Sequence, residues 1–341
     1  MPNRRRNAIV GTVLLATWIF AAQVSSLAQT APTLSPTTKR VVFDRTAFFG
    51  PSTPLPSWDN GYLVAREVET FQEGMPNVRL YDSSGNKVRE ASVWFPAAQR
   101  VLIYSAAATR DGRILASGTV EKSDGSAASF IAVTDLTGRV TNVIQTTGFA
   151  PTSVCEAPDG SIWAFGSTGY GLDSQANPGD MLRHFDFEKG QIGSYLPRSA
   201  FPQNLHPGPG VNTDIRCLAD QVVVYSRNAR AYIEMKFGTD VPKIYDVAAP
   251  PGFRFVEIAL AAPHKAYAYF SLKSKGGLYY LAFDPAGKSA TWQPIESTIG
   301  PWTQPGAIVG LWGSDGKDLL VSRAEDTAGS QAIYWATPIE H

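Results

Sequence analysis

Ionisable side chains occupy similar places in several of the strands that the sequence predicts. Glu156, Asp214, Arg216 and Glu257 fall near the starts of strands expected to lie innermost in their sheets. Carboxylates held close together could bind a divalent cation such as Ca²⁺ or Mg²⁺, or act as acid and base once burial had shifted their pKa values. The alternative, which we favour, is structural: Arg216 pairs with neighbouring carboxylates inside a water-filled channel.

Three further residues lie in predicted loops and could contact a ligand. The aromatic rings of Tyr170 and Trp302 could stack on a sugar ring or a peptide, or could instead cover the hydrophobic core beneath them. His206 lies in a loop that contains two Pro-Gly pairs, at residues 204–210. Binding and catalytic residues lie disproportionately in loops, so His206 could bind a ligand. A rigid Pro-rich connection without a binding role would explain the same residues.

Cys155 and Cys217 are the only cysteines, and both fall on predicted inner strands of neighbouring repeats. Cys155 lies four residues before its turn and Cys217 three, so their side chains point to opposite faces of their own sheets. Adjacent blades pack face to face through opposite sides of successive sheets. The two cysteine side chains could therefore meet between the sheets. A disulfide needs a Cα separation of about 5 to 6 Å, and two buried thiols remain the alternative.

The familiar catalytic and metal-binding motifs are absent from the sequence. It contains no Gly-x-Ser-x-Gly, no His-Glu-x-x-His, no phosphate-binding loop and no dinucleotide fingerprint. The four histidines have no metal-ligand spacing, and two cysteines without a Cys-x-x-Cys motif argue against zinc. We therefore predict no metal site and no resident cofactor, with a divalent cation as the alternative.

A repeated sequence motif predicts the strands and turns that position these residues. An apolar run, a turn built on Asp-Gly or Asn-Gly, and a second apolar run recur along the chain, and most repeats contain a second turn. Two hairpins make a four-stranded sheet. The first turns lie at residues 60–61, 111–112, 159–160 and 315–316, with degenerate versions at 220–221 (Asp-Gln) and 264–265 (His-Lys).

This repeat predicts an all-β fold, a six-bladed β-propeller with four-stranded antiparallel blades. We number the predicted units one to six along the chain. Unit six has three strands, at residues 307–312, 318–323 and 331–336, and residues 40–46 form an alternating strand with no unit of its own. We expect this amino-terminal strand to complete unit six, because the pairing removes two exposed sheet edges.

The interval between the third and fourth turns is 61 residues, the longest in the chain (220 minus 159). Its excess lies at residues 169–179, between two strands of unit three, and at residues 201–211, between units three and four. Both connections leave a propeller on the same face. We predict that this loop-rich face binds the ligand.

Charge and composition exclude some classes of protein. The 341 residues have a formal net charge of zero and only 18% charged residues, so no basic surface is available for nucleic acid. Hydrophobic residues make up 44% of the chain, which is enough for an ordered core.

The amino terminus predicts export. Arg4, Arg5 and Arg6 precede an uncharged stretch at residues 8–22 and small residues near Ala28, the pattern of a signal peptide. An uncleaved membrane anchor is the alternative. We predict a signal peptide at 1–28, a disordered spacer at 29–39 and a single propeller domain at 40–341. The mature chain would then be periplasmic or extracellular, without a membrane span.

One segment resembles a known family. Residues 157–166, Ala-Pro-Asp-Gly-Ser-Ile-Trp-Ala-Phe-Gly, are similar to the repeat of streptogramin lyase and the NHL-type propellers, and residues 111–118 are a weaker copy. Residues 333–336 also resemble one YWTD repeat of six-bladed receptor propellers. The resemblance implies the six-bladed fold. The metal-binding His, Glu, Asn and Asp positions of the streptogramin lyases and of the regucalcin-like lactonases have no match here.

We therefore predict a monomeric, exported binding module that recognises a peptide, a glycan or a protein partner on its loop-rich face. The alternative is a metal-dependent lactonase or lyase that works at the mouth of the central channel through Glu156, Asp214 and Glu257. A scaffold subunit of a larger envelope complex is a third possibility. A bound divalent cation would favour the enzyme.

Overall fold

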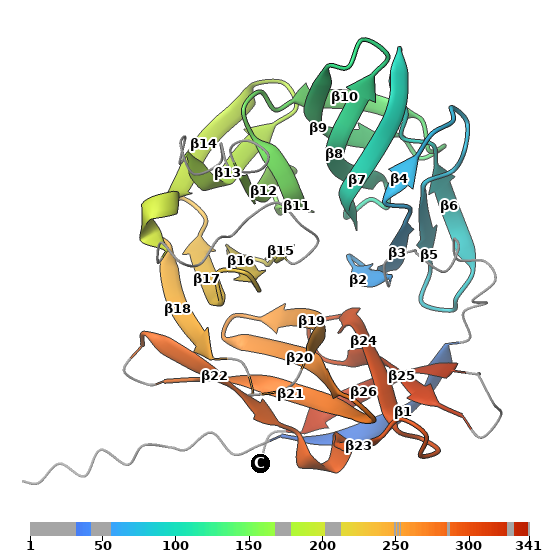
Figure 1. Ribbon diagram of the computed structural model, residues 1–341, viewed down its shortest axis with the longest axis vertical. Coiled ribbons are helices and arrows are strands. Elements are labelled where there is room, and N and C mark those ends of the chain that lie inside the picture. Colours follow the sequence, from blue (N-terminus) through green and yellow to red (C-terminus); the bar gives the residue numbers. More distant parts are fainter. Residues whose placement is uncertain are drawn as a thin grey trace, which may run out of the picture.

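The computed structural model describes residues 32–41, 56–167, 179–201, 213–248, 250, 252, 254–284, 287–325 and 331–339. Within these residues the fold is all-β, and the sheets stand around a central space (Figure 1). The short helices are two 3₁₀ turns, η2 (Arg198–Ala200) and η3 (Glu296–Thr298). None of the described helices is long and apolar enough to cross a membrane. The predicted signal peptide lies outside the described residues.

The described strands pair into four sheets of eight, five, four and nine strands, and we describe them by the predicted units. Units one and two comprise β2 (Ser57–Asp59), β3 (Tyr62–Arg66), β5 (Val78–Tyr81) and β6 (Lys87–Ala91), then β7 (Ala98–Ala108), β8 (Ile114–Lys122), β9 (Ala127–Thr134) and β10 (Val140–Gln145). Units three and four comprise β11 (Ala150–Glu156), β12 (Ile162–Ser167), β13 (Asp180–Asp186) and β14 (Gly190–Pro197), then β15 (Thr213–Cys217), β16 (Gln221–Ser226), β17 (Ala231–Lys236) and β18 (Lys243–Ala248).

The last two units repeat the same plan. They comprise β19 (Arg254–Ala262), β20 (Lys265–Leu272), β21 (Lys275–Phe283) and β22 (Ser289–Pro294), then β24 (Ile308–Ser314), β25 (Leu319–Ala324), β26 (Gln331–Ile339) and the amino-terminal β1 (Thr33–Val41). Two short strands were not predicted: β4 (Glu69–Thr70) pairs with β7, and β23 (Gly300–Pro301) pairs with β21.

The turn between β2 and β3 shows why the repeated motif folds this way. Asn60 and Gly61 have φ values of 43° and 89°. A two-residue type I′ hairpin requires positive φ at both central positions, and Asn-Gly accepts this better than other pairs. The turn at Asp159 is fixed differently, because its Oδ1 accepts the backbone N–H of Ser161 at 3.0 Å.

The amino-terminal strand closes the last unit, as predicted. β1 runs antiparallel to β26, from Thr33 opposite Ile339 to Val41 opposite Ile333, with an irregularity between Pro36 and Arg40. The pairing gives the outer edge of β26 its backbone partners. The predicted bounds of this closing strand were 40–46, and residues 42–46 lie outside the described residues.

The prediction of a disordered spacer at residues 29–39 is wrong for residues 33–39, which belong to β1. Their Pro-, Thr- and Ser-rich composition is typical of a solvated segment, so it gave no strand signal. Backbone pairing to β26 holds them instead, and an outermost strand tolerates proline because one of its edges needs no N–H donors.

Neighbouring units are also joined by strand pairing that the sequence did not predict. The outer strands β18 and β22 pair in parallel over Asp246–Ala248 and link units four and five. The inner strands β2 and β24 pair in parallel at Trp58 and Gly313, which links units one and six.

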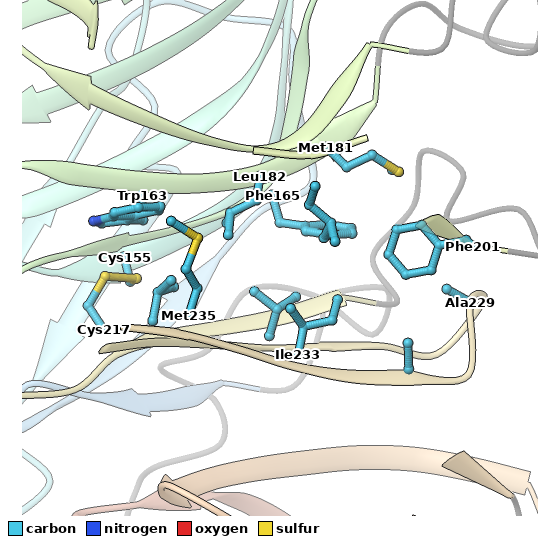
Figure 2. Packing of buried hydrophobic residues seen from close by; sticks show 14 of the residues in the cluster. Cys155, Trp163, Phe165, Met181, Leu182, Phe201, Cys217, Ala229, Ile233 and Met235 are labelled. Carbon is cyan, nitrogen blue, oxygen red and sulfur yellow. A yellow bond between two sulfur atoms is a disulfide. The ribbon is translucent and has the colours of Figure 1, made fainter. Parts of the chain in front are cut away.

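The hydrophobic core is divided among the interfaces between units. One cluster lies between units three and four and contains Trp163, Phe165, Leu182, Ile233 and Met235 (Figure 2). A corresponding cluster between units six and one contains two edge-to-face tryptophans, Trp58 and Trp335, with ring centroids 4.8 Å apart. The apolar surface is therefore buried between the sheets, and the centre is left to polar side chains.

Candidate functional site

Two central cavities are lined by the inner strands. The smaller, of about 90 Å³, has lining residues from β2, β7, β11, β15, β19 and β24. The larger, of about 300 Å³, shares Ser105, Asp214 and Ile258 with it, so the two are continuous. The larger central cavity lies at the amino-terminal ends of the inner strands. Its lining includes Thr213 and Asp214, the first two residues of β15. This is the face from which the loops at 168–178 and 202–212 leave the described strands.

Asp214 faces the larger central cavity. It is the second residue of β15, and its carboxylate accepts no hydrogen bond from the residues that the structure describes. The side chain is accessible from the cavity but surrounded by the inner strands. Loss of bulk water raises its pKa to about 7, and the positive charge of Arg66 opposes the shift. Asp214 is therefore an acceptor without a donor among the described residues.

Glu257 lines the same cavity from β19. Its Oε2 atom accepts the backbone N–H of Leu311 at 2.5 Å, across the interface between units five and six. Its Oε1 atom is buried without a hydrogen-bond partner in the described structure. Burial raises the pKa of Glu257 to about 8, the hydrogen bond from Leu311 lowers it, and the charge of Asp214 raises it further. Asp214 and Glu257 thus form an acidic pair.

Arg66 provides positive charge in the larger central cavity. It is the last residue of β3, and its Nη1 donates to the carbonyl of Ile103 at 2.7 Å. Burial lowers its pKa to about 10, and the charge of Asp214 opposes that shift, so the guanidinium stays charged at neutral pH. Its other N–H groups have no partner among the described residues. Arg66 and Asp214 attract each other without forming an ion pair.

Arg216 bonds to backbone carbonyls, not to the neighbouring carboxylates that we expected it to pair with. Its Nη1 donates to the carbonyls of Leu260 at 3.0 Å and Ser314 at 2.5 Å, which joins units four, five and six. Asp59, at the end of β2, accepts the N–H of Ala108 at 3.0 Å and has its pKa raised to about 6 by burial, with Arg216 opposing the shift. These residues line the smaller cavity and fasten the inner strands to one another.

Glu156 does not join Asp214 and Glu257, contrary to the predicted cluster of three carboxylates. Its Oε2 accepts the N–H of Arg110 at 2.8 Å, and the side chain is buried outside both central cavities. Glu156 is the last residue of β11, whereas Asp214 is the second residue of β15. The two therefore lie at opposite ends of their inner strands. No group of three His, Cys, Asp or Glu side chains in the described ranges could hold a metal ion.

Trp302, which the structure describes, does not line these cavities. Trp302 follows β23 and is 38% exposed, with its indole N–H hydrogen-bonded to the hydroxyl of Tyr269. It lies beside Gly276, at the turn between β20 and β21. Tyr170 and His206 lie outside the described residues, so their predicted contacts with a ligand stay predictions.

A serine, a histidine and an aspartate meet at the first turn of unit three but are not arranged as a catalytic triad. His184 Nε2 lies 2.7 Å from Ser161 Oγ, and Ser161 Oγ donates to Asp159 Oδ1 at 2.5 Å. The hydroxyl proton therefore points to the aspartate, whereas a triad needs it on the histidine. Burial lowers the pKa of His184, and its ring stacks on Trp163 at 4.3 Å. The group stabilises the turn.

The predicted disulfide is confirmed. Cys155 on β11 and Cys217 on β15 are bonded, with Cα atoms 5.6 Å apart. The bond lies at the inner end of the cluster between units three and four (Figure 2). The one-residue difference in phase between the two inner strands had indicated this bridge.

Sequence reasoning missed Arg66, Asp59 and Arg227. Arg66 and Arg227 lie at or just after the ends of second strands, at the level where the inner strands begin, and both line the larger central cavity. A charged residue at or just after the end of a second strand, as at Arg66 and Arg227, was the available signal.

No protein-family model matches the chain, and no curated protein matches it. The resemblance to streptogramin lyase and NHL-type propellers therefore stays a prediction. Among solved structures, the chain is similar to the Malassezia sympodialis allergen Mala s 1, with 11% identity, a TM-score of 0.46, and coverage of 84% of this chain and 92% of that chain.

Two other solved structures show a similar degree of likeness. A protein of unknown function from Dyadobacter fermentans has 12% identity and a TM-score of 0.46, covering 91% of this chain and 100% of that chain. A luciferin-regenerating enzyme has 11% identity and a TM-score of 0.43, covering 91% and 97%. Identities this low transfer no activity to the present chain.

Proposed function

We propose that this chain is an exported, monomeric six-bladed β-propeller that acts as a binding module, with its ligand pocket in the larger central cavity on the loop-rich face. The four-stranded grouping of the pairings supports a count of six blades. The Asn-Gly and Asp-Gly turns, the division of the core among the interfaces and the β1–β26 pairing agree with that plan. A disulfide and the amino-terminal sequence pattern support an oxidising destination.

One observation carries the choice of pocket. Most charged side chains near the axis bond to a backbone group of a neighbouring unit: Asp59, Glu156 and Arg216 do so, and so does one oxygen of Glu257. Among the residues that the structure describes, Asp214 has no such bond, and Arg66 uses only one of its donors. Polar groups left without partners in a cavity of about 300 Å³ are typical of a ligand site.

A thermal-shift screen of the purified full chain tests this proposal. The panel contains amino acids, short peptides, monosaccharides, uronic acids and diamines at millimolar concentration. At least one class should raise the melting temperature of the wild type by 2 °C or more, consistent with mass action. The increase should disappear in Asp214→Asn and persist in Glu90→Gln, an exposed control on β6. A hit that Asp214→Asn leaves unchanged, or no hit in any class, would contradict the proposed pocket.

The alternative function is a metal-dependent lactonase or lyase, and the proximity of Asp214 and Glu257 favours it. Two carboxylates whose oxygens are only partly engaged by donors among the described residues can contribute to a Ca²⁺ or Mg²⁺ site. Metal analysis of the full chain distinguishes the two. One equivalent of divalent ion in the wild type, lost in Asp214→Asn, would support the enzyme, whereas a metal-free protein that still binds its ligand would support the binding module.

A further inference from the structure

We infer that the larger central cavity selects a small zwitterion, an α-amino acid with an apolar side chain, whose carboxylate meets Arg66 and whose ammonium group meets Asp214. This inference rests on the proposed binding function and names its ligand class. It follows from three features of the cavity: opposed charges, an apolar wall and a restricted volume.

The opposed charges come from different units. Arg66 ends β3 in unit one, whereas Asp214 and Glu257 lie on β15 and β19, across the centre from β3 (Figure 1). Arg66 and Asp214 interact electrostatically without a hydrogen bond or an ion pair between them. A ligand that lies between them gains most if it offers an anion to the guanidinium and a cation to the carboxylate. A purely cationic or anionic ligand would leave one of the two without a partner.

Glu257 adds a second carboxyl group to the acidic side, and because both pKa values are raised, the pair is ionised, and binds an ammonium group best, above about pH 8. Its Oε1 atom has no hydrogen-bond donor among the described residues, and its charge interacts with that of Asp214. An ammonium group has three N–H donors, so it can serve more than one carboxylate oxygen. Arg227 also lines the cavity, but its guanidinium lies over the Phe255 ring at 5.3 Å. Arg66 is therefore the guanidinium that we expect to donate N–H groups to the carboxylate of the ligand.

The apolar wall lies next to the acidic pair. Phe255 and Val256 line the same cavity, and Val256 is 41% exposed, whereas the neighbouring Ile258 and Leu311 are buried in the hydrophobic core. An apolar side chain placed against this wall would be removed from water, which contributes about 25 cal/mol per Å² of buried apolar surface. A sugar would place hydroxyl groups against these side chains without hydrogen-bond partners.

The volume limits the size of the ligand. A cavity of about 300 Å³ holds on the order of ten water molecules, since each occupies about 30 Å³ in the liquid. That is the bulk of one amino acid with an aliphatic or aromatic side chain. A polymer could place only its end there.

Calorimetric titration of the full chain with charge-blocked analogues tests the inference. The probes are L-leucine, N-acetyl-L-leucine, L-leucinamide and N-acetyl-L-leucinamide. L-leucine should bind at least tenfold more tightly than either singly blocked analogue. In Asp214→Asn the preference for leucine over N-acetyl-leucine should fall below threefold, and in Arg66→Met the preference over leucinamide should fall likewise. Glu90→Gln should keep both preferences.

The outcomes separate this inference from the proposed function. If blocked analogues bind within threefold of leucine, or if sugars, uronic acids or diamines bind in an Asp214-dependent way while leucine does not, the zwitterion inference fails and the binding module stands. If none of the screened classes binds, both fail. Circular dichroism and melting temperatures of each variant exclude misfolding, and double-mutant titration of Arg66→Met with Asp214→Asn shows whether the two side chains act on one ligand.

Discussion

The disulfide between Cys155 and Cys217 joins the inner strands of two sheets that share no ladder hydrogen bonds among the described strands. Units four and five are linked by β18–β22, and units six and one by β2–β24. Units three and four rely instead on this covalent bond and on the cluster around Trp163 and Met235 (Figure 2). The disulfide therefore links two sheets that have no backbone pairing between their described strands.

Removing the disulfide should lower stability substantially. The bond closes a loop with a sequence separation of 62 residues, and the chain-entropy model assigns such a loop about 4 kcal/mol of unfolding free energy. Urea unfolding of Cys155→Ser/Cys217→Ser should show a loss of that order. A reductant should lower the stability of the wild type and leave the double variant unchanged; equal responses would show that the bond contributes nothing.

Removing β1 should open the last unit. A chain that starts at residue 42 loses the strand paired with β26 and exposes that edge. We expect its melting temperature to fall by about 5 °C or more, equivalent to a few kcal/mol. A chain that starts at residue 29 retains β1 and is the matched control, so it should melt at the higher temperature. Similar melting of the two chains would argue against closure by β1.

Stability should fall as the pH rises from about 4 to about 8. Asp214 and Glu257 have folded pKa values of about 7 and about 8, above their ordinary values of 3.8 and 4.5. In this interval the folded protein binds more protons than the unfolded chain, so the unfolding free energy decreases with pH. Glu257→Gln should reduce the loss between pH 5 and pH 8 by on the order of 1 kcal/mol.

Denaturant titrations at pH 5 and pH 8 measure this slope. Glu90→Gln, on the exposed surface of β6, should retain the slope of the wild type. If Asp214→Asn and Glu257→Gln also retain it, the two carboxyl groups are not protonated in the folded state near neutral pH.

Loss of Arg216 should be costly because its guanidinium serves two carbonyls from different units. Arg216→Met leaves both acceptors and the nearby Asp59 without that cation, and we expect a loss of about 3 kcal/mol in urea unfolding. Arg113→Met is the control, since Arg113 pairs with Asp111 at an exposed turn at 2.8 Å. Its loss should stay below about 1 kcal/mol. Comparable losses in the two variants would contradict a structural role for Arg216.

Much of the fold was predictable because turn chemistry is local. Asn60-Gly61 and the Asp-Gly pairs specify hairpins by their own φ preferences, and alternation sets the strands between them. The β18–β22 pairing was not predictable, because parallel contact between outer strands depends on how two sheets twist toward each other. The strand at residues 33–39 was missed because its partner, β26, lies at the other end of the chain.

The site was predicted in part. Sequence position correctly placed Asp214, Arg216 and Glu257 at the centre, since charged residues on inner strands have few other places to lie. It did not separate Glu156 from Asp214, because strand register along the axis depends on the length of each inner strand. Nor could it show which carboxylates would accept backbone N–H groups from a neighbouring unit and which, like Asp214, would accept none from the described residues.

The register of β1 on β26 sets Thr33 directly opposite Ile339. A linker of two or so residues in a type I′ turn could join these positions, which would give a backbone-cyclised protein whose last sheet is a continuous meander. New termini could then be cut at any of the other tight turns. Such permutants would reveal whether folding begins at a particular sheet or can start anywhere around the circle.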